Sequence, residues 1–303
     1  MSLLLVIGPD SPCGCGSGRR FGECHLVDGS VQVEPKEFNP PMPMTGESMK
    51  KCYFAFTNNC GGRLSREHII SQAVLRNISS RIIAVCFRDE VRRSTIVSDS
   101  LTVRRMCARH NSAFSRLDTE AGRLFNSIQT FSKRLSSSAG ETETCELRFF
   151  HRTDIERWLL KTLLNIYYSR MCGRRADTGL LKNIGTLFDG TLRAPYGLYM
   201  AGSWNQTFST VTANEISFTL TVDDGIVTGV QVILSGIEFN LLIAGTAVSS
   251  DAFLAAHIYR PKTLSFSDGE RVFDIYLVWE NGSETTIAFS PSNPIERPEG
   301  ILE

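Results

Sequence analysis

The chain has 303 residues, of which 42% are hydrophobic, so it is long enough for about two or three globular domains. It contains no apolar run of about 18 residues, the length of a membrane span, and its apolar start lacks the basic lead-in of a signal peptide. The net charge of zero hides a split, because residues 1–175 carry 26 Lys and Arg against 17 Asp and Glu, and residues 176–303 carry 6 against 15. The basic half favours a polyanionic partner such as nucleic acid, although solvated helix faces would give the same composition.

The first predicted element is a zinc knuckle in residues 1–30, within the stretch PCGCGSGRRFGECHL. Cys13, Cys15, Cys24 and His25 are four soft ligands, which is the set that tetrahedral zinc requires. About thirty residues bury too little apolar surface to fold alone, so we expect the metal to stabilise this unit. The stretch resembles the SEC-C zinc motif, found at the end of the secretion motor ATPase and attached to many unrelated proteins. The resemblance implies a protein partner or a nucleic acid for this module.

Residues 31–48 contain four prolines and no hydrophobic periodicity, which predicts an extended linker. A second unit is expected in residues 49–135. There, helical periodicity predicts a short helix over 71–78 and one long helix or two consecutive ones over 107–135.

A second group of potential zinc ligands lies in this unit and consists of Cys52, Cys60, Cys107 and His110. The last two are three residues apart and therefore lie on one face of a helix. Nine cysteines are an odd number, and most of them fall in these two clusters. This pattern indicates metal sites in a reducing compartment, the cytoplasm, rather than a disulfide framework.

The stretches KCYFAFTNNCGGRLSREHIISQAVL and SLTVRRMCARHNSAFSRLD resemble the signature of HNH nucleases, a zinc-clamped hairpin and helix of treble-clef type. The resemblance implies that the zinc is structural, that His68 is the general base, and that Glu67 and Asn111 hold a catalytic magnesium or manganese ion. A neutral imidazole suits a base near pH 7, and a carboxylate suits a hard cation. Ser100 stands where the usual motif has its middle Asn, and the first two zinc ligands are seven residues apart instead of the common two. Asp118 either supports this site or is an exposed helix residue.

Residues 136–190 are predicted to form a helical connector, with a flexible joint followed by a helix capped by Asp154. In residues 191–303, apolar and polar residues alternate, and Asp224-Gly225 predicts a hairpin turn. These residues are therefore expected to form an antiparallel β-domain.

The expected fold class is α+β, with a small zinc knuckle, an HNH ββα-metal treble-clef domain with helices, and a C-terminal antiparallel β-domain. The expected function is a metal-dependent HNH endonuclease that hydrolyses phosphodiester bonds of nucleic acid, with DNA as the expected substrate. Architectures of this kind resemble bacterial defence nucleases, an analogy at the level of the fold. The alternative is a non-catalytic zinc adaptor that binds nucleic acid or a protein partner. The knuckle or the β-domain would contact a protein partner, and we expect no membrane association.

Overall fold

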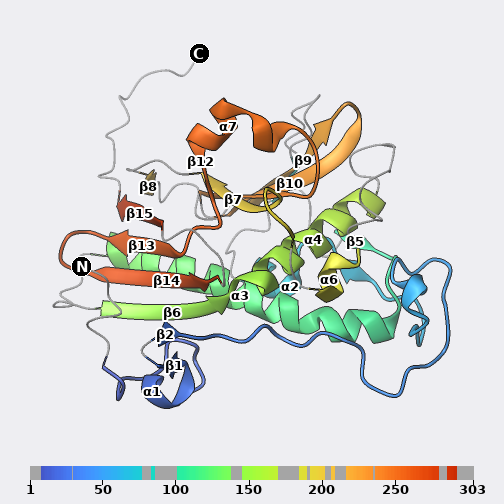
Figure 1. Ribbon diagram of the computed structural model, residues 1–303, viewed down its shortest axis with the longest axis horizontal. Helices are drawn as coiled ribbons and strands as arrows, with labels where there is room; N and C mark the ends of the chain where they lie inside the picture. Colours follow the sequence, from blue (N-terminus) through green and yellow to red (C-terminus); the bar gives the residue numbers. More distant parts are fainter. Residues whose placement is uncertain are drawn as a thin grey trace.

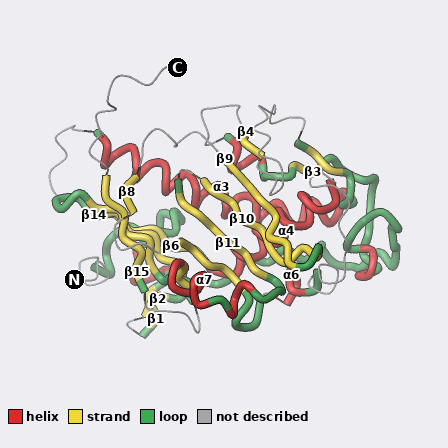
Figure 2. Tube along the Cα trace, turned by 90° about the horizontal axis from the view of Figure 1, so that it is seen from above, coloured by secondary structure: helices red, strands yellow, loops and turns green. Residues whose placement is uncertain are grey.

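The computed structural model describes residues 8–28, 30–76, 83–85, 101–137, 145–169, 184–189, 192–201, 206–208, 216–234, 236–279 and 285–291. Two sheets and two long helices dominate this part of the chain, so the predicted α+β class is confirmed (Figures 1 and 2). None of the described helices combines the length and the apolar character that a membrane crossing requires.

The N-terminal unit is small. It contains α1 (Phe21–Cys24) and a hairpin of β1 (Leu26–Val27) with β2 (Ser30–Val31). It lies below the edge of one large sheet, beside strand β6 (Cys145–His151) (Figure 1).

The second unit combines a pair of two-residue strands with a short helix and a long helix. Its elements are η2 (Ala55–Thr57), β3 (Glu67–His68), α2 (Gln72–Leu75), β5 (Thr102–Val103) and α3 (Ala108–Ser136). Strand β3 pairs antiparallel with β5, so that His68 lies opposite Thr102. Helix α2 begins after Ser71, whose hydroxyl accepts a hydrogen bond from the Val74 backbone. The predicted long helix is one continuous element of 29 residues.

A five-stranded sheet has the order β6-β14-β13-β15-β8. Besides β6 it contains β14 (Val272–Val278), β13 (Thr263–Ser267), β15 (Thr286–Pro291) and β8 (Gln206–Phe208). Only β13 and β14 pair antiparallel, whereas β6 with β14, β13 with β15, and β15 with β8 pair parallel. The prediction of a purely antiparallel β-domain is therefore wrong for this sheet. The reason is that β6 and β14, β13 and β15, and β8 and β15 are not consecutive strands, so each of these pairs is joined by a longer connection that allows the strands to run parallel.

The six-stranded sheet has the order β12-β7-β11-β10-β9-β4. Its strands are β4 (Ile83–Val85), β7 (Gly197–Ala201), β9 (Ile216–Asp223), β10 (Ile226–Leu234), β11 (Ile237–Leu242) and β12 (His257–Tyr259). All neighbours are antiparallel except β4 and β9. The predicted hairpin turn is confirmed, because Asp224 and Gly225 join β9 to β10 with φ angles of 47° and 79°. Two short helices, η5 (Ala247–Ser249) and α7 (Asp251–Ala256), precede β12.

Helices α3 and α4 (Arg152–Ser169) hold the two sheets together, and α6 (Thr186–Asp189) packs on α4. Phe131 of α3 stacks on Phe273 of the five-stranded sheet, and Phe125 contacts both Trp158 of α4 and Phe239 of the six-stranded sheet. One continuous buried cluster includes side chains from the second unit, both long helices and both sheets. The predicted capping role of Asp154 is wrong, because α4 begins two residues earlier, at Arg152.

Candidate functional site

The four residues that the sequence predicts as ligands of the N-terminal zinc lie together in the structure. The ligand atoms of Cys13, Cys15, Cys24 and His25 all lie within 4.8 Å of one another. The sulfur atoms of Cys15 and Cys24 are 3.6 Å apart. Zinc–sulfur bonds of about 2.3 Å in a tetrahedron place two sulfurs about 3.8 Å apart, so this cluster can hold zinc.

Polar groups around this cluster favour thiolates. The Cys24 sulfur lies 3.3 Å from the Ser17 hydroxyl and accepts a hydrogen bond of 3.4 Å from the Arg19 guanidinium. Burial opposes ionisation of Cys15, but hydrogen bonds from Ser17 and the neighbouring thiols outweigh it and lower the pKa of Cys15 to about 6. Burial raises the pKa of the Cys13 thiol to about 12, and a bound cation would favour its thiolate form.

The knuckle is docked on the edge of the five-stranded sheet. The Gly14 carbonyl accepts a hydrogen bond from the Phe149 backbone at 3.3 Å, and the Phe21 ring stacks on Phe149 with centroids 5.4 Å apart. A Cβ at Gly14 would lie 2.1 Å from the Leu147 carbonyl oxygen, so only glycine permits this approach. The knuckle thereby covers backbone groups of the edge strand β6.

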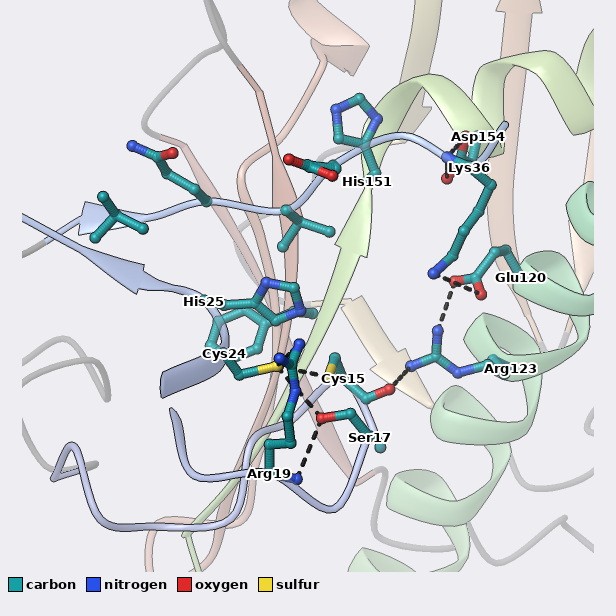
Figure 3. A pocket seen from close by; sticks show the side chains of 16 residues that line it. Cys15, Ser17, Arg19, Cys24, His25, Lys36, Glu120, Arg123, His151 and Asp154 are labelled. Carbon is teal, nitrogen blue, oxygen red and sulfur yellow. Dashed lines mark hydrogen bonds and ion pairs between the residues drawn. The ribbon is translucent and has the colours of Figure 1, made fainter. Parts of the chain in front are cut away.

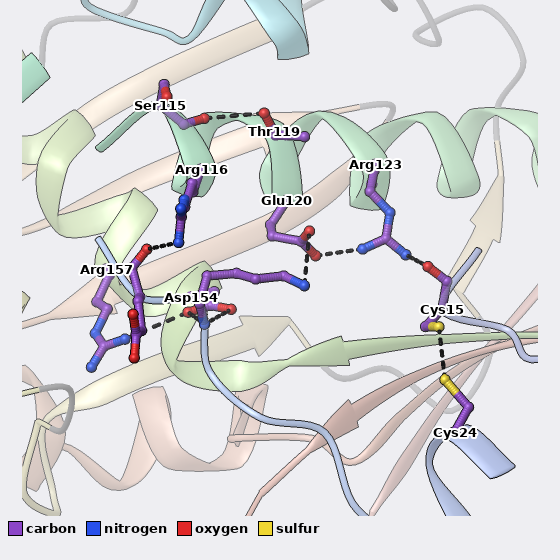
Figure 4. Close-up of polar contacts among 11 residues, drawn as sticks. Cys15, Cys24, Ser115, Arg116, Thr119, Glu120, Arg123, Asp154 and Arg157 are labelled. Carbon is purple, nitrogen blue, oxygen red and sulfur yellow. Dashed lines mark hydrogen bonds and ion pairs between the residues drawn. The ribbon is translucent and has the colours of Figure 1, made fainter. Parts of the chain in front are cut away.

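Three arginines of α3 fasten the N-terminal segment to the helix. Arg109, Arg116 and Arg123 are seven residues apart and so lie along one face of the helix. They donate hydrogen bonds to the carbonyls of Pro43 at 2.8 Å, Glu37 at 3.0 Å and Cys15 at 2.5 Å, respectively. Figure 4 shows the last two contacts, and Figure 1 shows the blue segment after β2 running beside α3. The predicted linker is therefore extended, and it is packed along α3.

A pocket of about 630 Å³ lies between the knuckle, this segment and α3 (Figure 3). Its lining contains charged side chains of both signs that form ion pairs. Glu120 pairs with Lys36 at 3.8 Å and with Arg123 at 2.5 Å. Asp154 lines the same pocket and accepts hydrogen bonds from the Lys36 backbone at 3.1 and 3.0 Å. The cations of the pocket are thus largely neutralised by the protein's own carboxylates.

The four predicted ligands of the second zinc also lie together in the structure. Cys52, Cys60, Cys107 and His110 are all buried, and their ligand atoms lie within 4.8 Å of one another. The His110 Nδ1 atom is 3.1 Å from the Cys107 sulfur and 3.7 Å from the Cys52 sulfur. Backbone N–H groups of Cys107 and Gly61 donate to the sulfurs of Cys52 and Cys107. Such a closed set of four ligands is typical of structural zinc.

Thr57 fixes the orientation of the His110 ring. No motif in the sequence predicts this role of Thr57. Its hydroxyl donates to the Phe54 carbonyl at 2.8 Å, so its oxygen accepts from His110 Nε2 at 3.1 Å. The proton therefore lies on Nε2, and Nδ1 presents its lone pair to the thiols. Burial, with a contribution from Arg109, lowers the pKa of His110 to about 4, which keeps the ring neutral and able to bind zinc.

Glu67 and His68 lie on β3, and Glu67 faces the helices. Glu67 is 5% exposed, and its carboxylate receives a hydrogen bond from the Asn111 side chain. Lys161 of α4 places its Nζ 2.6 Å from Glu67 Oε1 and 2.6 Å from Asp118 Oδ2. Asp118, whose side chain is 20% exposed, thus belongs to this site. His68 is half-buried, and its carbonyl accepts a hydrogen bond of 3.1 Å from the Asn165 amide.

The electrostatics of this cluster reflect one ammonium and two carboxylates. The carboxylates outweigh the burial of Lys161 and raise its pKa, so its ammonium is fully charged. Burial, together with the charge of Asp118, raises the pKa of Glu67 despite the ion pair with Lys161. The Oδ1 atom of Asp118 is buried without a hydrogen-bond partner among the described residues. Oxygen atoms are the ligands that a hard cation prefers, and one oxygen of Asp118 is unpartnered among the described residues. In this structure both carboxylates are paired with Lys161.

Ser100, the predicted replacement for the middle Asn, lies outside the described residues. Lys161 was missed, although the sequence contains a signal for it. In the stretch WLLKTLL the lysine is three residues from Trp158 and three from Leu164, on the buried stripe of α4. A charged residue at such a position requires buried partners of opposite charge.

No model of a known protein family matches the chain, and no curated protein or solved structure matches it either.

Proposed function

We propose that the protein is an HNH-type nuclease that hydrolyses phosphodiester bonds of nucleic acid. One observation carries the proposal. Asn111, which directly follows the predicted zinc ligand His110, donates a hydrogen bond to Glu67, and His68 is the next residue of β3 after Glu67. A structural zinc unit needs neither a buried glutamate nor an amide aimed at it.

In this proposal His68 accepts a proton from the water that attacks the scissile phosphate. Two contacts support its position. The Asn165 amide holds the His68 carbonyl, and the Asn165 oxygen accepts a hydrogen bond of 3.0 Å from the Tyr53 hydroxyl. The strand that carries the base is therefore fixed to α4 and to the zinc-binding loop.

A magnesium or manganese ion would be held by the oxygens of Glu67, Asn111 and Asp118. Such an ion supplies positive charge to the phosphate and to the leaving oxygen. Asn111 follows His110 directly, so the two side chains leave α3 about 100° apart. One helical turn therefore serves the zinc cluster and the acidic site at the same time.

The surface of this unit supports a polyanionic substrate. In the described ranges 49–76 and 101–111, the exposed cationic side chains are Lys50, Lys51, Arg63, Arg66, Arg76 and Arg104. The one acidic residue in these ranges, Glu67, is buried. Cations of this kind bind phosphates, with an affinity that falls as the salt concentration rises. DNA is the substrate that we propose to test first, with RNA as the comparison.

A second candidate function is a zinc adaptor without catalysis. The ion pairs of Lys161 favour it, because a lysine that neutralises Glu67 and Asp118 gives both carboxylates a structural role. The adaptor would use the same cationic surface or the knuckle to bind nucleic acid or a protein partner.

Replacement of His68 distinguishes the two functions. Purified protein is incubated with plasmid, single-stranded DNA and RNA in the presence of magnesium or manganese, with EDTA as the control. We expect His68→Ala to lower the cleavage rate by about a hundredfold or more and to leave substrate binding intact, because general-base catalysis contributes on that scale. His257→Ala is the matched control, since this histidine lies in the six-stranded sheet. Cleavage by His68→Ala at the wild-type rate would refute the nuclease. Binding of nucleic acid by the wild type without any cleavage would favour the adaptor.

A further inference from the structure

Lys161 occupies the position that a metal ion would take between two carboxylates. Its Nζ lies 2.6 Å from one oxygen of Glu67 and 2.6 Å from one oxygen of Asp118. The residue is 1% exposed, so its ammonium is enclosed by the protein and out of reach of a substrate. The lysine therefore acts on the carboxylates and not on the reacting phosphate.

The charges at this position are not balanced. One ammonium faces two carboxylates, and the second oxygen of Asp118 is buried without a partner among the described residues. The Asn111 side chain donates to Glu67 but brings no charge. A divalent cation would neutralise the pair completely, whereas the ammonium leaves one negative charge in excess.

We propose that Lys161 competes with a divalent cation for Glu67 and Asp118, so that the site has a lysine-held form and a cation-held form. The inference rests on the proposed function in one respect only, namely that the bound cation serves catalysis. Lys161 is tethered by α4 beside the two carboxylates, so a cation must displace it and also overcome its positive charge. Lys161 is thus a positioning residue that sets how much free cation the site requires.

Manganese binding tests this inference without any substrate. The zinc-loaded full chain is titrated with Mn²⁺, and free Mn²⁺ is measured by electron paramagnetic resonance. We expect Lys161→Met to bind one Mn²⁺ at least about tenfold more tightly than the wild type, because a full charge at contact distance is removed. Lys133→Met is the matched control, since Lys133 is an exposed lysine of α3. The double variant Glu67→Gln, Lys161→Met should lose this tight Mn²⁺ site.

Equal Mn²⁺ affinity in Lys161→Met and the wild type would overturn the inference, as would a tightened site that survives Glu67→Gln. If Lys161→Met does not fold, side-chain ¹⁵N NMR of the wild type replaces it. The protected Lys161 ammonium signal should shift or broaden when excess Mg²⁺ is added, and an unchanged signal would overturn the inference. A Mn²⁺ site that tightens in a protein that cleaves nothing keeps the inference and refutes the nuclease. If the protein cleaves nucleic acid with a metal ion but Lys161→Met leaves the Mn²⁺ affinity unchanged, the nuclease is supported and the inference is overturned.

Discussion

Replacement of Thr57 by valine should weaken zinc binding although Thr57 is no ligand. The Thr57 oxygen accepts the Nε2–H of His110 at 3.1 Å, and the ring presents Nδ1 to the thiols for that reason. Loss of such a partner of a metal-bound histidine typically costs about ten- to a hundredfold in metal affinity, or about 1.4 to 2.7 kcal/mol. Because the metal-bound state is the folded state, the same free energy is lost from folding.

Zinc affinity is measured by titration with a chromophoric chelator, and stability by thermal unfolding in zinc-saturated buffer. Thr57→Ser is the matched control, since its hydroxyl retains both the contact with His110 and the donation to the Phe54 carbonyl. We expect the serine variant to behave like the wild type. Zinc affinity and unfolding temperature of Thr57→Val equal to those of the wild type would refute the assignment of the Nδ1 atom as the ligand.

Three further results are expected. Elemental analysis of the folded protein should give two zinc ions per chain, and one ion would mean that a cluster is not a metal site. Gly14→Ala should lower the free energy of unfolding by about 1 to 3 kcal/mol without loss of zinc, because its Cβ would overlap a carbonyl of β6; Gly8→Ala, which meets nothing within 4 Å, is the control. The ion pair of Glu238 with His257 should stabilise the fold most between pH 4.5 and 6.5, the ordinary pKa values of the two groups. The hydrogen bond from His257 lowers the pKa of Glu238 to about 2, so this contribution is lost as the pH falls from 4.5 toward 2. The same bond raises the pKa of His257, so the contribution is lost again as the pH rises above 6.5. A difference in unfolding free energy between the wild type and Glu238→Gln that does not change with pH would contradict this reasoning.

The two metal clusters could be predicted because their chemistry is local. Zinc requires soft ligands, and each set contains a pair of ligands at short spacing, such as Cys107 and His110 on one helical turn. The partners of Glu67 could not be predicted in this way, because Lys161 and Asp118 come from two different helices that only tertiary packing brings together. Nothing local in the sequence distinguishes Asp118 from an exposed helix residue.

The pairing of strands could not be predicted from the sequence either. The alternation in CELRFFH suits a strand, with Leu147 and Phe149 buried on the face that the knuckle covers. Nothing in that alternation says that β6 pairs with β14, which lies near the other end of the chain and runs parallel to it. Hydrophobic periodicity identifies the buried face of a strand, whereas the pairing of β6 with β14 depends on a long connection that includes α4 and most of the six-stranded sheet.

The zinc cluster and the acidic site are linked through the rotation of α3 about its own axis. His110 is held in the cluster by its ring, and this contact fixes the rotation of the first turn. Asn111 is the next residue and Asp118 follows it seven residues later, so both side chains lie on the same face of α3 and point toward Glu67. A rotation of one residue, about 100°, would turn both away from Glu67 and leave Lys161 without Asp118. A zinc ion bound by Cys52, Cys60, Cys107 and His110 would therefore fix the helix phase on which the geometry of the acidic site depends.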